Sequence, residues 1–295
     1  MSPWQNKFYR RPRLGLALSG GGARGLTHIG VLKVLEQEGI AADLVVGTSM
    51  GGVIAAAYAV GMTAAEIERE ALENSRPRRL LRLIDPAPAS GGLIGGQRIQ
   101  EYFEHLVGQR TFADLRCPLA MVAVDLNTRR EVILQEGPVA EALRATTAVP
   151  GVFAPLEKDG MRLVDGGVLN NLPVDVARKM GAEVVIAVDI SPTRESEYSH
   201  WFDNRRWVPK GLLSTFQVLE ETISTLMIAA QEHKLRQFPP DLLLRPDLPR
   251  EVTVFAGFER AAELIAIGEE ITRRHLPEIQ SLLARRWRWP AAPHE

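Results

Sequence analysis

The sequence predicts an α/β fold of three layers, in which helices cover both faces of a central, mostly parallel sheet. Short apolar runs that have the character of buried strands alternate with segments of helical periodicity, which is typical of a parallel sheet between two helical layers. Two of the expected strands end in glycine-rich turns, Gly20–Gly25 and Gly47–Gly51, and a helical pattern follows each turn. These turns are where we look for function.

Composition limits the function further. The chain has 295 residues, 45% of them hydrophobic, which is enough for a sizeable core in one large domain or at most two. With 35 basic and 36 acidic residues, the net charge of −1 argues against a nucleic-acid binder, which would show a basic surplus. A single cysteine, Cys117, cannot form an internal disulfide and fits a reducing compartment. We interpret Cys117 as a core residue.

The N-terminal tail, residues 1–13, is basic and lacks the continuous apolar stretch of a secretory signal. No segment reaches the roughly 18 apolar residues that suggest a membrane span. The sequence therefore predicts a soluble, cytoplasmic protein.

The first half of the chain shows a regular alternation of elements. Expected strands cover 14–18 and 43–47, and expected helices cover about 29–39, 50–60 and 64–72. Thr63 is the predicted N-cap of the last of these helices, and Glu66 completes a capping box with it.

Between residues 74 and 96 the alternation stops in a basic sequence rich in proline and glycine. A loop of this length is more often a lid or a binding loop than a passive link, so residues 76–96 are a candidate lid. A plain surface connection and a disordered segment are the alternatives.

The second half of the chain returns to strands and helices. Strands are expected at 119–124, 131–134, 162–164, 184–188 and 241–244, and helices at 174–180, 213–238 and 255–283. The polar and aromatic segment 191–212 is expected to be a mobile loop. Because no linker separates two units, we expect residues 14–191 to form the core, with residues 192–295 adding a loop and helices to the same domain.

Ser49 stands in the pattern of a nucleophile elbow, Gly47-Thr48-Ser49-Met50-Gly51, between an expected strand and an expected helix. On such a turn the serine hydroxyl projects clear of the backbone, and the flanking Gly47 and Gly51 are needed where Cβ atoms would clash. The N-terminus of the following helix favours negative charge beside the serine. The alternative is a tight turn with an incidental serine.

The first glycine turn has the spacing of a dinucleotide-binding loop, but the acidic residue expected at the end of the next strand is replaced by the elbow. The loop is better suited to an oxyanion hole, because a glycine turn at a helix start offers unpaired N–H groups. The candidate residues are Gly20, Gly21, Gly22, Ala23, Arg24 and Gly25. For Arg24, binding an anionic head group and fixing the loop through a salt bridge both remain open.

A serine nucleophile needs a proton acceptor. None of the six histidines follows a late strand, where a serine hydrolase of this type would place its base. Only His28, near the glycine loop, has a position in the sequence that favours it as the base. Asp165 follows the expected strand 162–164 and precedes Gly166 and Gly167, which allow a sharp turn beside the carboxylate. A plain hairpin turn is the alternative at this position.

Taken in order, the glycine loop, the elbow and Asp165-Gly166-Gly167 resemble the motifs of the patatin-like phospholipase family, specifically its small bacterial members. The stretches Arg144–Pro155 and Leu163–Asp189 are also similar to that family. The resemblance covers roughly residues 14–191 and is weaker in the helices that follow.

The resemblance implies a Ser–Asp dyad without histidine: Ser49 as nucleophile, Asp165 as base and residues 20–25 as the oxyanion hole. It also implies hydrolysis of lipid acyl esters without a metal or other cofactor. Met50 stands where many members have alanine, and it is expected to narrow the acyl pocket or to make it more apolar. A non-catalytic lipid-binding adaptor of the same fold and a short-chain carboxylesterase are the rival hypotheses.

Two segments are suited to peripheral contact with a membrane. The candidate lid combines four arginines with leucine and isoleucine, and the tail Arg285–Trp289 alternates arginine with tryptophan. A solvated charge run and a terminus packed on the body are the alternatives. Head group, acyl chain length and oligomeric state stay open.

Overall fold

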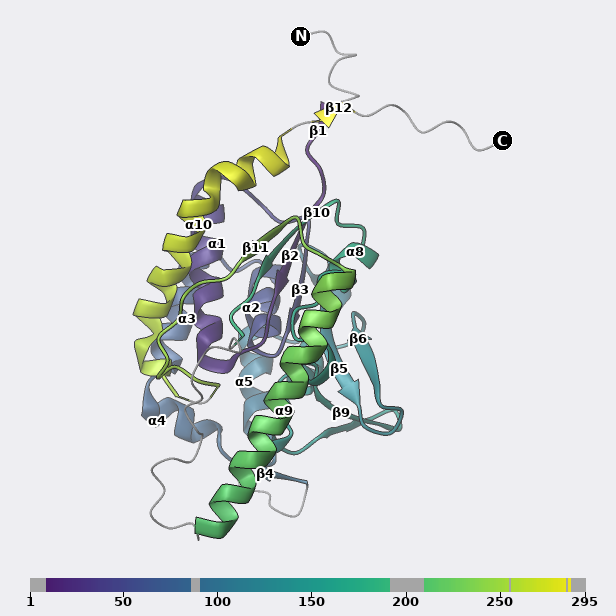
Figure 1. The fold of residues 1–295 in the computed structure, drawn as a ribbon, viewed down its shortest axis with the longest axis vertical. Helices are drawn as coiled ribbons and strands as arrows, with labels where there is room; N and C mark the ends of the chain where they lie inside the picture. The colour runs from purple at the N-terminus through teal and green to yellow at the C-terminus, as the bar shows by residue number, and fades with distance from the viewer. Residues whose placement is uncertain (1–8, 86–90, 192–209, 255, 285, 288–295) are drawn as a thin grey trace, which may run out of the picture.

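The structure is a computed structural model, and it describes residues 9–85, 91–191, 210–254, 256–284 and 286–287. Its central sheet has the strand order β11-β10-β2-β3-β5-β9-β8, and β6 pairs with β5. The strands from β11 to β5 are parallel, whereas β9, β8 and β6 are antiparallel to their neighbours. Figure 1 shows helices on both sides of this sheet, as the predicted three-layer fold requires.

The sheet strands are β2 (Leu14–Leu18), β3 (Leu44–Thr48), β5 (Leu119–Asp125), β6 (Arg130–Leu134), β8 (Leu156–Lys158), β9 (Met161–Asp165), β10 (Val184–Val188) and β11 (Leu242–Leu244). Helices are α1 (Thr27–Gln37), α2 (Met50–Ala59), α3 (Ala64–Asn74), α4 (Pro77–Leu80), α5 (Gln97–Val107), α6 (Val139–Thr146), α7 (Gly167–Asn170), α8 (Val174–Lys179), α9 (Lys210–Gln237) and α10 (Ala261–Leu283). Short 3₁₀ helices are η2 (Gly22–Leu26), η3 (Leu81–Leu83), η5 (Phe112–Asp114) and η6 (Phe258–Arg260).

The core follows from the alternation of side chains along the strands. On β2, Leu14, Leu16 and Leu18 face a large cluster with α1, α2 and α10, while Ala17 faces a smaller cluster with α8. All three leucines are fully buried. Because successive residues of a strand point to opposite faces, a strand buried on both sides has no polar positions. This explains why these strands are recognisable as continuous apolar runs.

Two further pairs of short strands lie outside the central sheet. β1 (Tyr9–Arg10) pairs with β12 (Arg286–Trp287), and β4 (Gly92–Ile94) pairs with β7 (Gly151–Phe153). In Figure 1 the first pair lies near the two termini and the second at the opposite end of the molecule. The two described residues of the Arg–Trp tail are therefore far from the candidate lid; the rest of that tail lies outside the described residues.

The segment 74–96 is more structured than the sequence indicated. Pro77 opens α4, a position that proline favours in a helix, and β4 follows later in the segment. Asp85 closes the segment because its carboxylate accepts hydrogen bonds from the main-chain N–H groups of Gly96 and Gln97 at the start of α5. Residues 86–90 lie outside the described residues. Whether 76–96 acts as a lid stays a prediction.

Other expectations can be compared directly with the structure. The capping box of Thr63 and Glu66 is present at the start of α3. Cys117 is only partly buried at the edge of the main cluster, which corrects its interpretation as a core residue. α9 begins at Lys210, a few residues earlier than expected, and most of the predicted mobile loop lies outside the described residues.

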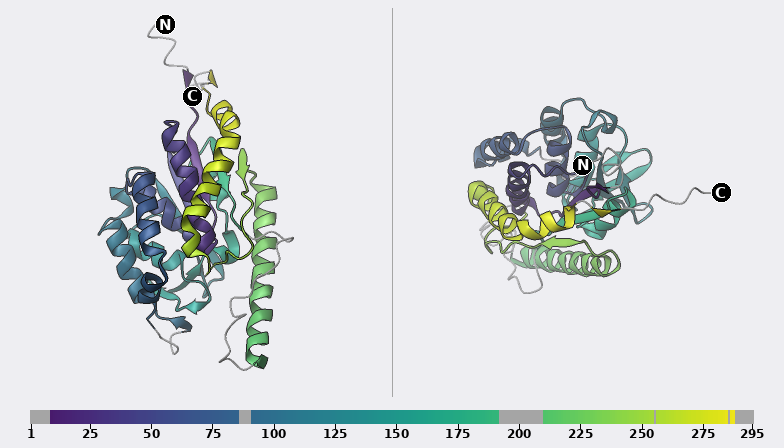
Figure 2. Two further views of the ribbon diagram at one scale, coloured as in Figure 1. Left: turned by 90° about the vertical axis from the view of Figure 1, so that its left-hand side faces the viewer. Right: turned by 90° about the horizontal axis from the view of Figure 1, so that it is seen from above.

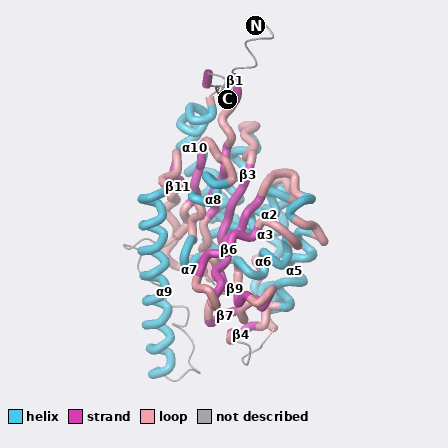
Figure 3. Tube along the Cα trace, turned by 90° about the vertical axis from the view of Figure 1, so that its right-hand side faces the viewer, coloured by secondary structure: helices cyan, strands magenta, loops and turns pink. Residues whose placement is uncertain are grey.

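α9 and α10 pack on different parts of the body. Figure 2 shows α10 beside α1, and Figure 3 shows α9 along the side of the molecule that carries α7. Many close approaches between α1 and α10, and between α7 and α9, agree with these views. The residues after 191 thus contribute a strand to the sheet and helices to both outer layers.

Candidate active site

Ser49 lies at the junction of β3 and α2, with backbone angles φ 53° and ψ −126°. Few residues other than glycine adopt a positive φ, and the cost is tolerated where the fold requires the turn. A Cβ on Gly47 would lie 2.4 Å from the carbonyl oxygen of Gly51, and one on Gly51 would lie 2.3 Å from that of Leu18. The turn has the geometry of a nucleophile elbow, and both glycines are needed for it to close.

The backbone of Ser49 is held by a residue that the sequence analysis had not singled out. Its N–H donates to Oγ1 of Thr146 at 3.0 Å, and the Thr146 hydroxyl donates to the carbonyl of Val122 at 2.6 Å. Ser49 itself is 8% exposed. Thr146 therefore fixes the elbow against β5 through a buried hydroxyl.

Asp165 reaches the same edge of the sheet from a different strand. It is the last residue of β9, opposite Ala123 of β5, and Thr48 of β3 lies opposite Val122 on the other side of β5. The Asp165 carboxyl, 6% exposed, interacts with the hydroxyl of Ser49 and accepts the N–H of Gly167 at 2.8 Å. The two candidate catalytic side chains are thus brought together.

Burial raises the pKa of Asp165 to about 6, although the hydrogen bonds from Ser49 and Gly167 favour the charged form. A carboxyl of this pKa is largely ionised at neutral pH and is a better proton acceptor than an ordinary aspartate.

The two glycines after Asp165 allow the tight turn beside it. A Cβ on Gly166 would lie 2.3 Å from the carbonyl oxygen of Val122, and one on Gly167 would lie 2.9 Å from the methyl of Met227. Met227 belongs to α9, so this helix borders the site.

The glycine loop lies directly against Ser49. A Cβ on Gly20 would be 2.9 Å from that of Ser49. The N–H groups of Gly20, Ala23 and Arg24 donate within the protein, to the carbonyls of Asn171, Val254 and Gly21.

The two central amides of the loop differ from the others. The N–H groups of Gly21 and Gly22 have no acceptor among the described residues. Gly22 has φ 58°, and a Cβ there would lie 2.0 Å from the carbonyl oxygen of Val254. Of the six residues considered for the oxyanion hole, Gly21 and Gly22 offer the available donors. Gly25 lies within η2 and packs against Met50.

Arg24 and His28 both contribute to holding the loop. Nε of Arg24 donates to the carbonyl of Val252 at 2.8 Å, so Arg24 helps to fix the loop through a main-chain hydrogen bond. His28 is fully buried, and its Nε2 bonds the carbonyl of Ser19 at 2.9 Å. Burial lowers the pKa of His28 to about 4, so the ring is neutral at physiological pH. No contact found in the described residues joins His28 to Ser49.

Within the described ranges, no three or more His, Cys, Asp or Glu side chains are grouped as a metal ion would require. None of the described helices is both long enough and apolar enough to cross a membrane.

The chain is similar to known proteins over most of its length. The family model of the patatin-like phospholipases matches residues 16–178, a span that contains the glycine loop, the elbow and Asp165. The chain belongs to the patatin-like phospholipase family. The resemblance seen in the three motifs is thus confirmed, and membership implies a lipid hydrolase.

Individual relatives extend the match. An uncharacterized NTE family protein of Mycobacterium tuberculosis is 29% identical over 90% of this chain and 91% of its own length. Patatin-like phospholipase domain-containing protein 6 of Homo sapiens is 36% identical over 65% of this chain, but only 14% of that protein is covered. The crystal structure of VipD from Legionella pneumophila matches 90% of this chain and 67% of that chain, with a TM-score of 0.51 and 16% identity. That last match shows a shared fold only.

Proposed function

We propose that this protein is a serine acyl hydrolase that cleaves fatty-acyl ester bonds of phospholipids or lysophospholipids. Ser49 is the nucleophile, Asp165 is the base, and the N–H groups of Gly21 and Gly22 form the oxyanion hole. The observation that carries the proposal is the meeting of the Ser49 hydroxyl with a buried carboxyl whose pKa is raised to about 6. This geometry needs no histidine.

The reaction follows from these positions. Oγ of Ser49 attacks the ester carbonyl while its proton passes to the Asp165 carboxylate, and the amides of the glycine loop stabilise the resulting oxyanion. Collapse of the intermediate transfers the proton from Asp165 to the leaving alcohol and leaves an acyl-serine. Water then attacks this ester, its proton passes to Asp165, and the fatty acid leaves as Ser49 recovers its proton.

A membrane surface is the proposed source of the substrate. Leu81 and Leu93 of the candidate lid are 65% and 55% exposed, and Val218 of α9 is 61% exposed. The elements that carry them lie at the same end of the molecule in Figure 1: η3, which directly follows α4, then β4 and the first half of α9. The exposed Arg78 and Arg82 lie in the same candidate lid. Apolar side chains beside basic ones suit an anionic lipid surface.

The test is release of fatty acid from vesicles of phosphatidylcholine or lysophosphatidylcholine, measured by mass spectrometry. Wild-type protein is expected to release fatty acid, whereas Ser49→Ala and Asp165→Asn are expected to lose the activity with their folds intact. Ser75→Ala, which alters a buried serine at the end of α3, is the matched control. Binding of lipid without turnover would favour the adaptor, and turnover of butyrate esters alone would favour the short-chain esterase.

A further inference from the structure

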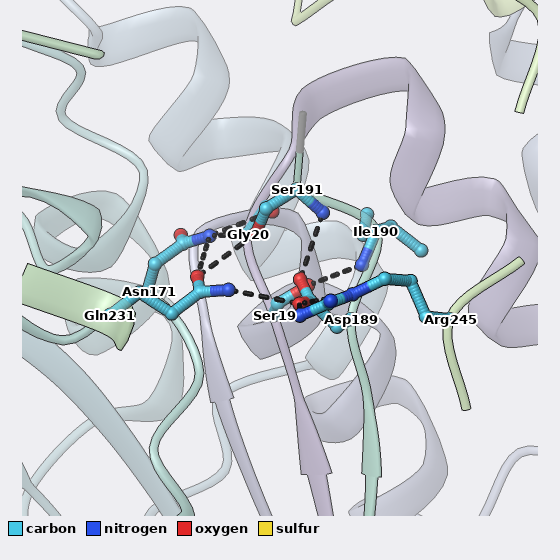
Figure 4. Close-up of polar contacts among 8 residues, drawn as sticks. All are labelled: Ser19, Gly20, Asn171, Asp189, Ile190, Ser191, Gln231 and Arg245. Carbon is cyan, nitrogen blue, oxygen red and sulfur yellow. Dashed lines mark hydrogen bonds and ion pairs between the residues drawn. The ribbon is translucent and has the colours of Figure 1, made fainter. Parts of the chain in front are cut away.

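Gly20 is held at both of its polar main-chain groups by one residue, Asn171. The N–H of Gly20 donates to the main-chain carbonyl of Asn171 at 3.2 Å, and Nδ2 of Asn171 donates to the carbonyl of Gly20 at 3.3 Å. The two residues are 151 positions apart in the chain. Figure 4 shows the Asn171 side chain directed at Gly20 from the segment after α7.

The second of these contacts determines the direction of a neighbouring donor. The carbonyl of Gly20 and the N–H of Gly21 belong to one planar peptide, and in a trans peptide they point in opposite directions. A carbonyl held toward Asn171 therefore keeps the N–H of Gly21 pointed away from it. That N–H has no acceptor among the described residues, and Gly20 packs against Ser49.

The Asn171 side chain is held in turn. Its Nδ2 also donates to Oγ of Ser191 at 2.8 Å and to Oε1 of Gln231 at 3.2 Å, and the Ser191 hydroxyl donates to the same Oε1 at 2.9 Å. Asn171 and Gln231 are each 7% exposed. Two amide hydrogens are thus shared among three acceptors, all on residues far away in the chain.

Asp189 determines which groups of this network donate hydrogen bonds and which accept them. Its Oδ2 accepts Nε2 of Gln231 at 3.0 Å and Nη2 of Arg245 at 2.6 Å, and its Oδ1 accepts the N–H of Ser191 at 3.0 Å. An ionised carboxylate only accepts hydrogen bonds, so the Gln231 amide must turn its NH₂ toward Asp189 and its oxygen toward Asn171. Asn171 must then present its own NH₂ to Gln231 and to Gly20.

From this geometry we infer that Asn171 is a positioning residue, which orients the Gly21 N–H of the oxyanion hole through the Gly20 peptide. Gln231 and Asp189 fix the orientation of the Asn171 amide. The inference rests on the proposed function. Asn171 touches no reacting atom, and its effect is expected in the transition state, where the oxyanion forms, rather than in the binding of the substrate.

The test compares Asn171→Ala and Asn171→Asp with the wild type. Both variants keep the main-chain bond to Gly20 and lose the side-chain donor. Three quantities are measured: kcat and KM, affinity for a trifluoromethyl ketone analogue that forms an oxyanion on the serine, and affinity for an unreactive ether analogue. Loss of a whole oxyanion donor lowers kcat about 10²–10³-fold, so a misdirected one is expected to lower it at least about tenfold.

Affinity for the ketone should fall by a similar factor, while KM and affinity for the ether stay within about twofold. Asn170→Ala is the matched control, since Asn170 is a buried neighbour whose amide donates to Asp175 and Glu131 instead of the loop. It is expected to lower stability and to leave the ratio of the two affinities unchanged. Gln231→Leu keeps Asn171 in place, so it carries the same test if the Asn171 variants fail to fold.

The inference is overturned if folded Asn171 variants keep wild-type kcat and ketone affinity, or if they lose both affinities equally. Failure of the proposed function gives a different result: a wild type that neither hydrolyses the lipid nor binds the ketone more tightly than Ser49→Ala does. That outcome would overturn both proposals.

Discussion

Asp165 illustrates how burial can prepare a carboxyl for proton transfer. An exposed aspartate, whose pKa is close to the ordinary value, is a weak base toward a serine hydroxyl. Asp165 is enclosed at the end of β9, and this burial raises its pKa to about 6. His28, the rival base, is neutral and bonded to the carbonyl of Ser19. At the scale of single residues, the proposed chemistry thus depends on a carboxyl that is costly to keep buried in its charged form.

The pH dependence of kcat/KM follows from this pKa. Asp165 must be ionised to accept a proton, so activity is expected to rise with pH and to level off above an apparent pKa near 6. Initial rates on a soluble ester between pH 4.5 and 8.5 measure it. The same pH dependence should be found in His28→Gln. If the rise in kcat/KM with pH disappears in this variant, the histidine and not Asp165 is the group that titrates.

Asp165→Asn is expected to inactivate the protein and to stabilise it. The folded pKa near 6 exceeds the ordinary value near 3.8, so this group's stabilising contribution is fully present below about pH 4 and is lost as pH rises through 6. At pH 8 the free energy of unfolding of Asp165→Asn should therefore exceed that of the wild type by up to about 3 kcal/mol. Urea denaturation at pH 8 and pH 4 measures the difference, which should nearly vanish at pH 4. A loss of stability at pH 8 would contradict the account.

Among the elements, the buried strands were the most predictable. The predicted strands 14–18 and 184–188 have the same first and last residues as β2 and β10. A strand that is buried on both faces is apolar along its whole length, so its ends are visible in the sequence. α5 was missed. Its N-terminal amides are bound by Asp85, which precedes them by about 12 positions, and Gly96 at its start offers no capping side chain. A helix start built from a distant carboxylate leaves no local capping signal.

The candidate site likewise contains residues that the sequence predicts and residues that it does not. Ser49, Asp165 and the glycine loop were recognised because each lies in a compact local motif. Thr146, which holds the amide of Ser49, acts across 97 positions, and Asn171 acts across 151. Contacts of that range depend on the sheet bringing strand ends together, so the sequence alone did not reveal them.

The tight turn of the glycine loop gives a prediction for the element itself. Gly22 and Gly39 both have positive φ, of 58° and 66°, but a Cβ on Gly39 would meet nothing within 4 Å. Gly39→Ala is therefore expected to cost only backbone strain, about 1–2 kcal/mol. Gly22→Ala should cost more stability and should also lower turnover, because the loop must move away from Val254. Thermal unfolding and fatty-acid release measure both; equal effects of the two changes would contradict the tight fit.

At the scale of the whole molecule, the described part of the candidate lid and the first half of α9 lie at the end opposite the β1–β12 pair in Figure 1, and both carry exposed apolar side chains. This arrangement predicts that the protein contacts an anionic lipid surface with this end. Basic residues near an anionic surface each contribute about 1 kcal/mol to binding at low salt. Arg78 and Arg82 are both exposed in this region.

The double variant Arg78→Glu/Arg82→Glu should therefore bind vesicles of phosphatidylserine at least about tenfold more weakly than the wild type does. Arg273→Glu/Arg274→Glu on α10 changes the net charge equally and is the matched control. Cosedimentation with vesicles at two salt concentrations measures the effect. Equal losses in both double variants would indicate attraction by net charge alone, with no docking end.

Labelling with a fluorophosphonate is the most direct test of the central claim that Ser49 is activated by Asp165 without a histidine. Intact and peptide mass spectrometry of the folded protein should find one adduct, on Ser49. Labelling should be absent in Ser49→Ala, much slower in Asp165→Asn and unchanged in His28→Gln. Folded wild-type protein that stays unlabelled at Ser49, or that labels at the same rate without the Asp165 carboxylate, would contradict the claim.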